Sequence, residues 1–301
     1  MFPTLLIPLA LDVRDAELLA AAVTLVGTAG VKNVHLVYVH AMDVVGNPLL
    51  GGIPVETFTP AAPEGLAGLA DELRERLTAA GRSDVSVHRH HMAGRPHERI
   101  TALAGEIDAD LLVFGRLRAG DGHEAWGAHA QLLTRYAHRS VLVVPHGSTL
   151  SLSDVRVGID FSPRSLEACK AACLLGQEVK AIYSMNPDEG MTHSGITIEE
   201  FMGRLRANAT QQFHDEVLTE LAPGAATPTL VMLETDNIVD TLLGALHGAG
   251  LAVVASRGMT AMASMLLGST AQEIAGRADA PVLILRTKGE DMGLFASLLS
   301  R

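Results

Sequence analysis

The sequence predicts an α/β fold: two tandem doubly wound domains, each with a five-stranded, mainly parallel sheet covered by helices on both faces. Short apolar runs alternate with longer amphipathic stretches along the whole chain. Several apolar runs, such as Leu111–Phe114 and Val141–Val144, contain no polar residue at all. Such runs are typical of parallel strands buried on both faces, and strand–helix alternation predicts right-handed crossovers. The order of elements recurs after about 145 residues, the length of a duplicated domain.

The first copy contains five predicted strands separated by helices. We expect strands at Thr4–Leu9, Asn33–His40, Val85–His91, Asp110–Phe114 and Ser140–Pro145. We expect helices at Arg14–Gly27, Glu64–Ala80, Pro96–Ile107 and Gly127–Tyr136. In such a sheet the first and fourth strands should flank the point where the strand order reverses, and a ligand crevice lies at their carboxyl ends.

The second copy repeats this order. We expect strands at Val155–Asp160, Val179–Met185, Thr229–Leu233, Leu251–Ala255 and Pro281–Leu285. We expect helices at Pro163–Leu175, Ile198–Leu221, Asn237–Leu246 and Ser269–Ala278. The fourth strand of this copy therefore ends at Ala255.

The spacing of the last elements supports a true repeat. Ser140 follows Gly127 by the same 13 residues that separate Pro281 from Gly268. A small, polar segment lies between the copies and is predicted to be a linker. We therefore expect a first domain at residues 1–147, a second domain at 153–288 and a short amphipathic tail at 289–301.

Composition excludes several classes of protein. The 301-residue chain is 48% hydrophobic with a net charge of −11, so a nucleic-acid partner is not expected. Cys169 and Cys173 are too few for a disulfide scaffold and are predicted to be core residues on one helix face. The N-terminus lacks the basic segment of a signal peptide, and no apolar run is long enough to span a bilayer. We expect a cytoplasmic protein without membrane insertion.

Small residues follow the fourth strand of the second copy. Ala255 runs into Ser256 and the glycine at 258, and Gly268 with Ser269 opens the next helix. Glycine lets the backbone approach an anion closely, and the free N–H groups of a helix start point toward it. The sequence therefore predicts an anion site at this edge of the sheet.

This pattern resembles the universal stress protein family, whose ATP-binding members carry G-x2-G-x9-G-[S/T]. The corresponding run here is Ala255-x2-Gly258-x9-Gly268-Ser269, and Asp160 matches the family's nucleoside-contacting Asp at the end of strand one. The resemblance covers nearly the whole chain and looks like the family's two-domain members. It implies a Rossmann-like fold of the adenine nucleotide alpha hydrolase type. It also implies bound ATP, or ADP or AMP, in the second copy, with Mg²⁺ accompanying ATP.

The resemblance assigns roles to individual residues of the second copy. Met185 would line the base, Val254 and Ala255 would border the ribose and triphosphate, and the helix start would hold the phosphates. The implied nucleotide-binding residues are Gly158, Asp160, Met185, Val254, Ala255, Arg257, Gly258, Gly268, Ser269, Thr270 and Ala271.

Three points in this site stay open. Ala255 stands where the family has glycine, which costs about 1 kcal/mol if its φ must be positive. Ser269 is alternatively an ordinary N-cap, with Gly258 a turn residue. Arg257 is either a phosphate ligand or a solvated charge.

The first copy departs from the motif. Ala10 stands at the position of Asp160, and the loop that begins at Gly115 is one residue shorter and lacks the serine. We therefore expect a degenerate nucleotide site here. Arg116 and Arg118 are expected to be solvated charges more than anion ligands.

In the stretch His88-Arg89-His90-His91, His88 and His90 lie on one face of a predicted strand with His97 nearby, which is a conceivable metal-binding spacing. No carboxylate or cysteine accompanies them in the sequence, so we expect ordinary polar residues and no metal.

Three functions remain open. The leading one is a non-catalytic adenine-nucleotide-binding protein with a regulatory role in the stress response. The others are a scaffold that binds no nucleotide, and a slow ATPase or adenylyl transferase. Because last strands in this family commonly pair edge to edge, Val141–Val144 and Val282–Leu285 are expected to form an intrachain pseudo-dimer. A homodimer is a further expected assembly.

Overall fold

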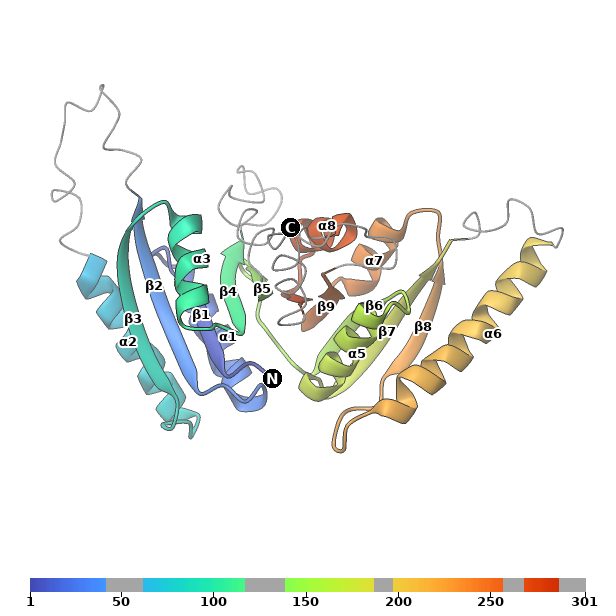
Figure 1. The fold of residues 1–301 in the computed structure, drawn as a ribbon, viewed down its shortest axis with the longest axis horizontal. Coiled ribbons are helices and arrows are strands. Elements are labelled where there is room, and N and C mark those ends of the chain that lie inside the picture. Colours follow the sequence, from blue (N-terminus) through green and yellow to red (C-terminus); the bar gives the residue numbers. More distant parts are fainter. Residues whose placement is uncertain (42–61, 117–138, 187–196, 257–267, 287–301) are drawn as a thin grey trace, which may run out of the picture. The chain divides into compact units, whose positions relative to one another are not determined.

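The computed structural model describes residues 1–41, 62–116, 139–186, 197–256 and 268–286 of the chain. The chain divides into two compact units, Met1–Thr149 and Leu150–Arg301, here called the first and the second unit. Figure 1 draws the first unit in blue to green and the second in yellow-green to red.

The first unit is built on a parallel sheet with the strand order β3-β2-β1-β4-β5. Its strands are β1 (Thr4–Pro8), β2 (Asn33–Ala41), β3 (Ser86–Gly94), β4 (Leu111–Arg116) and β5 (Ser140–Pro145). Its described helices are α1 (Asp15–Thr28), α2 (Ala62–Ala79) and α3 (Pro96–Glu106). Helices α1 and α2 contact each other, and α3 packs on β2 and β3. Figure 1 shows α2 and α3 on opposite sides of these strands.

The second unit repeats this topology with the strand order β10-β9-β6-β7-β8, again parallel. Its strands are β6 (Asp154–Ile159), β7 (Glu178–Met185), β8 (Thr229–Glu234), β9 (Leu251–Ala255) and β10 (Val282–Leu285). Its helices are α5 (Pro163–Leu175), α6 (Ile198–Glu216), α7 (Ile238–Leu246) and α8 (Ser269–Arg277), with a 3₁₀ turn at Leu218–Glu220.

The central strands explain why these sequences form covered sheets. Every residue of β5 is buried, as are Leu111 to Phe114 of β4 and Leu251 to Val254 of β9. A strand with apolar side chains on both faces needs a helical layer on each face. The predicted fold class is thereby confirmed, while the predicted pairing between residues 141–144 and 282–285 stays a prediction.

The ends of some elements differ from the predicted ones, and β3 is an example. β3 continues to Gly94, three residues beyond the predicted end, because Ala93 and Gly94 still pair with β2. Arg99 Nε donates to the carbonyl of Ala93 (3.0 Å). Gly94 has φ +135°, and a Cβ there would lie 2.8 Å from Arg99 Nε, so this contact requires glycine. Cys169 and Cys173 are buried on α5, as predicted. The helix predicted at 127–136 lies outside the described residues.

Candidate functional site

The strand order of the second unit reverses between β6 and β9. These strands are neighbours, with Val155 opposite Leu251 and Val157 opposite Val253. β7 continues the sheet from β6, and β10 continues it from β9. Ligands of open α/β sheets bind outside the carboxyl ends of the strands at such a point, and Asp160 and Ala255 lie there.

Helix α8 begins beside this point, and its first N–H groups are free in the sense that they have no acceptor within the helix. Gly268 is its N-cap residue (φ −62°, ψ 147°), and no side chain caps the helix. The Gly268 N–H donates to the carbonyl of Ser256 (2.8 Å), and the Ser256 N–H donates to Leu285 O (3.0 Å), which ties the helix start to β9 and β10. The first three helical N–H groups, those of residues 269 to 271, have no carbonyl one turn earlier to bond to. They form an anion-accepting helix start.

The alternative in which Ser269 caps this helix is wrong. Ser269 is the first helical residue and not the N-cap, which is Gly268. The Ser269 side chain is exposed and that of Thr270 is half-buried. Both hydroxyls are therefore accessible for a ligand beside the free N–H groups.

The remaining predicted site residues fall into three groups. Asp160 and Ala255 are half-buried at the carboxyl ends of β6 and β9, whereas Met185, Val254 and Ala271 are at most 5% exposed and can support a ligand only as its buried wall. Gly158 lies within β6, where a Cβ would contact Leu242 of α7 at 3.6 Å. Arg257 and Gly258 lie outside the described residues.

The alanine in the glycine position of the motif is not strained. Among the described residues, the non-glycine residues with positive φ are Leu11, Asp108 and Phe161, so Ala255 is outside the left-handed region. The equivalent residue of the first unit is Gly115, where a Cβ would meet its neighbours at 3.8 and 3.9 Å. A methyl group therefore fits this strand position at ordinary contact distances.

The loop between β6 and α5 is closed by three side chains of which the sequence analysis identified one. Asp160 Oδ1 accepts the N–H (3.0 Å) and the hydroxyl (2.5 Å) of Ser162. The Asp160 N–H donates to Ser165 Oγ (3.2 Å). Ser162 is the N-cap of α5 and Pro163 is its first residue, a combination that is readable from sequence.

In the first unit, one expectation at the corresponding edge is wrong. Arg116 ends β4 with only 4% of its surface exposed, and it is therefore not a solvated charge. The carbonyl of Arg116 accepts the N–H of His146 (2.6 Å), which follows β5. Arg118 lies outside the described residues. Arg116 is buried although the residue before it, Gly115, is exposed.

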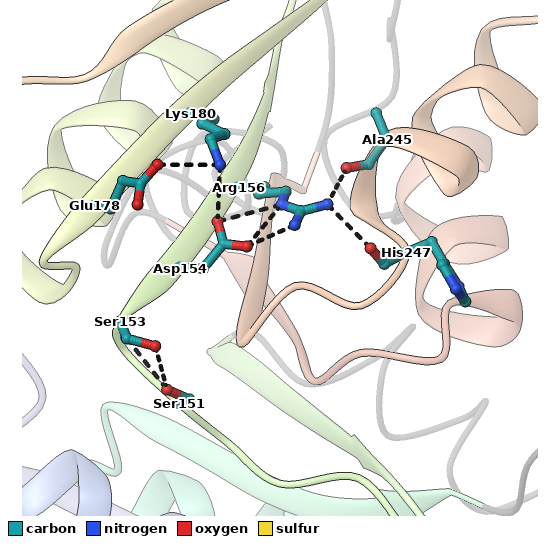
Figure 2. Close-up of polar contacts among 8 residues, drawn as sticks. All are labelled: Ser151, Ser153, Asp154, Arg156, Glu178, Lys180, Ala245 and His247. Carbon is teal, nitrogen blue, oxygen red and sulfur yellow. Dashed lines mark hydrogen bonds and ion pairs between the residues drawn. The ribbon is translucent and has the colours of Figure 1, made fainter.

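The opposite, amino-terminal edge of the second unit carries a compact ionic network (Figure 2). Arg156 of β6 binds the Asp154 carboxylate (2.5 Å), and Lys180 of β7 lies 3.7 Å from it. Arg156 Nη1 also donates to the carbonyls of Ala245 (2.9 Å) and His247 (3.0 Å) at the end of α7. The hydrogen bond from Arg156 lowers the pKa of Asp154. The charged groups pair with one another, and Arg156 also binds the carbonyls at the end of α7. We therefore regard this network as structural.

Histidines of two strands form a cluster on the first unit. His35 Nδ1 of β2 lies 2.8 Å from His90 Nε2 of β3, a hydrogen bond. The His35 ring stacks on His88 (centroids 4.4 Å apart) and on His90 (5.1 Å), with interplanar angles of 21° and 18°. His91 stacks instead on Tyr38 (5.8 Å). Sequence analysis missed His35, because strand pairing brings it to the cluster.

His35 and His90 of this cluster bind protons weakly, and the described residues are not arranged as a metal site. Burial, followed by the neighbouring His88 and His90, lowers the pKa of His35 to about 4. Burial and His88 also lower the pKa of His90, against the opposite effect of Glu106 on α3. The lone pairs of an imidazole lie in its ring plane, so stacked rings do not converge on one cation. Within the described residues, no group of three or more histidine, cysteine, aspartate or glutamate side chains is arranged to hold a metal ion.

The fold and the site together define a class: tandem doubly wound α/β units, of which the second places a free helix start at its strand-reversal point. The family model of the universal stress protein family matches residues 1–145 and again residues 153–286. The chain therefore belongs to the universal stress protein family, as a tandem two-domain member.

Solved structures show the same fold at low sequence identity. A universal stress protein from Archaeoglobus fulgidus DSM 4304 is 16% identical with a TM-score of 0.63, over 96% of this chain and 97% of that one. A protein described as functionally unknown from Pseudomonas aeruginosa PAO1 is 17% identical with a TM-score of 0.66, over 99% and 97%. At these identities the likeness shows the fold alone. A comparison with curated proteins gave no match. Among the described residues, no helix is long and apolar enough to cross a membrane.

Proposed function

We propose that the second unit binds an adenine nucleotide, ATP or else ADP or AMP, and that its occupancy regulates the protein without a strong catalytic activity. The observation that carries this proposal is the free start of α8. Its N–H groups stand beside the end of β9, held there by the bond from Gly268 to Ser256. The spacing from Ala255 to Ser269 is that of the phosphate loop in the family's ATP-binding members.

The described residues provide the two kinds of contact that a nucleotide needs. The helix start and the hydroxyls of Ser269 and Thr270 supply donors for phosphate oxygens, and each charge-assisted bond contributes about 1.5–3 kcal/mol. Asp160, across the strand-reversal point, supplies an acceptor for the nucleoside. Such a local site is necessary because the net charge of −11 repels an anion at long range.

The composition of the site supports binding more than hydrolysis. Asp160 is the only carboxylate among the predicted site residues, and it already accepts two hydrogen bonds from Ser162. That engagement holds it as an acceptor and not as a base for an attacking water. If Mg²⁺ accompanies ATP, we expect the phosphates to supply most of its ligands.

One substitution tests the phosphate contact without disturbing the helix. Ser269→Pro removes the N–H and the hydroxyl at the first helical position, where proline is favoured. The ψ of 147° at Gly268 suits a residue that precedes proline. We expect ATP affinity, measured by isothermal titration calorimetry, to fall by about ten- to a hundredfold. The matched control, Ser269→Ala, keeps the N–H and should lose less.

A second measurement needs no variant. The purified protein is denatured, and the released small molecules are separated and compared with ATP, ADP and AMP standards. Recovery of an adenine nucleotide supports the proposal. No nucleotide in this assay, together with no titratable binding at millimolar ATP, would favour the scaffold function and overturn the proposal.

A further inference from the structure

The loops that follow the first strand of each unit share one backbone conformation. Leu11 and Phe161 occupy equivalent positions and have φ values of 60° and 59°, which are unusual for bulky side chains. Counting from these two residues makes Ala10 equivalent to Asp160. It likewise makes Asp15 equivalent to Ser165.

Both loops bind their backbone N–H groups at the same two places. In the second unit, the N–H of Asp160 donates to Ser165 Oγ (3.2 Å), and the N–H of Ser162 donates to Asp160 Oδ1 (3.0 Å). In this unit the two N–H groups are therefore accepted by two side chains, the hydroxyl of Ser165 on the helix and the carboxylate of Asp160 at the strand end. The carboxylate is half-buried and lies at the crevice.

In the first unit, a single side chain performs both tasks. The N–H of Ala10 donates to Asp15 Oδ1 (3.1 Å), and the N–H of Asp12 donates to Asp15 Oδ2 (3.2 Å). Asp15 is the first residue of α1 and is 2% exposed. Burial raises the pKa of Asp15, while the hydrogen bonds from the N–H groups of residues 10 to 12 act against that rise.

We propose that each loop requires a carboxylate that accepts the N–H of residue 12 or 162, and that the position of this carboxylate, on the strand end at Asp160 or on the helix at Asp15, determines whether the unit offers an acceptor to a nucleoside. The first loop carries a further carboxylate, that of Asp12, which is bound to Arg14. Asp15 is then a positioning residue, whose buried carboxylate accepts the loop N–H groups of Ala10 and Asp12. The first unit therefore has the methyl of Ala10 at the position of the Asp160 carboxylate. This inference has two halves. The ligand half, which concerns the acceptor for a nucleoside, rests on the proposed nucleotide site, whereas the loop half, which concerns the carboxylate that each loop requires, does not.

The loop half is tested by a double-mutant cycle in the full-length chain, read by hydrogen–deuterium exchange of the segment 159–166. Asp160→Ala removes the acceptor of the buried Ser162 N–H and hydroxyl, and Ser165→Asp places a second carboxylate beside the first. We expect each single substitution to raise the exchange rate of this segment about tenfold. The double variant Asp160→Ala with Ser165→Asp carries the first-unit arrangement and should exchange within about threefold of the wild type.

The reciprocal double-mutant cycle tests the first unit. Its variants are Asp15→Ser, Ala10→Asp and the double variant, and the measurement is hydrogen–deuterium exchange of segment 9–16. The matched control is Glu167→Gln, which removes an exposed carboxylate from α5 beyond its first turn and should leave exchange unchanged. Coupling in both units supports the inference. If the effects of the single substitutions simply multiply in the double variants, the carboxylates are not interchangeable and the inference is wrong.

The ligand half is tested with the same double variant of the second unit. Its loop is intact but its carboxylate is buried, so its ATP affinity should fall about tenfold or more. Unchanged affinity in that variant overturns the ligand half. If the wild-type chain itself binds no ATP, the proposed function fails and the ligand half with it, whereas the exchange cycle still decides the loop half.

Discussion

The first and second units repeat the same strands, order and loop conformations, yet they differ in side chains at both edges of their sheets. At the carboxyl edge, the carboxylate that closes the loop belongs to the helix in the first unit (Asp15) and to the strand end in the second (Asp160). The duplicated backbone is therefore compatible with two different hydrogen-bonding solutions. The loop-closing carboxylate is half-buried in the second unit and fully buried in the first.

The amino edge shows a second difference of this kind. In both units the residue before the fourth strand donates its N–H to the residue at the start of the first strand: Asp110 to Thr4 (2.9 Å), and Gly250 to Asp154 (3.0 Å). In the first unit the Asp110 carboxylate also accepts the Thr4 N–H (2.8 Å). In the second unit a Cβ at Gly250 would lie 2.5 Å from the carbonyl of Ser151, so no side chain fits.

The largest expected effect comes from the ionic network that the first unit lacks, since buried Leu6 stands at the position equivalent to Arg156. Arg156→Met should lower the free energy of unfolding by about 3 kcal/mol, because it leaves Asp154 and the end of α7 without their donor. Urea unfolding measures the loss. The exposed pair of Arg204 with Glu200 supplies the control: Arg204→Met should leave the midpoint nearly unchanged.

The next effect tests the crowding at Gly250. Gly250→Ala should lower the free energy of unfolding by about 2 kcal/mol, because the methyl would force the Ser151 backbone to move. Gly244→Ala, in the last turn of α7 where a Cβ would have nothing within 4 Å, should instead stabilise by up to about 1 kcal/mol. Equal effects of the two substitutions in thermal melts would contradict the account of this edge.

The smallest effect concerns the histidine cluster, which is particular to the first unit. The folded-state pKa of His35 is about 4, below its unfolded value of 6.5. The unfolded chain therefore binds more protons between these pH values, and stability is complete above pH 6.5 and falls toward pH 4. After allowance for the partly exposed ring, we expect a loss of at most about 1 kcal/mol.

His35→Phe keeps an aromatic ring in the cluster and removes this titration, so its unfolding free energy should depend less on pH than that of the wild type. His91→Phe, which replaces a histidine outside the cluster, is the control. A wild-type pH dependence that survives His35→Phe would show that other groups cause it.

Hydrophobic patterning predicted most of the fold, because the apolar residues of a strand or an amphipathic helix indicate which of its faces are buried. It could not predict features that depend on contacts between distant residues. The end of β3 at Gly94 depends on its pairing with β2, and the same pairing forms the histidine cluster by bringing His35 beside His88.

The candidate site was predictable in part for a related reason. Motif spacing placed Gly268 and Ser269 at a helix start at the correct edge of the sheet, but which of them caps the helix depends on backbone torsions. Asp15 was missed because an acidic residue in the first turn of a helix is common and usually exposed, whereas this one turns inward to the loop. Arg116 was expected in solvent because arginine is charged, but it is the last residue of a largely buried strand and is itself buried.

The central claim is that one unit offers a nucleotide site and the other does not. Photoaffinity labelling of the full chain with an azido-ATP, followed by peptide mapping, tests it most directly. We predict saturable labelling near one equivalent per chain, competed by ATP and confined to peptides from residues 153–286. Competed labelling within residues 1–145, or equal labelling of both units, would contradict the account.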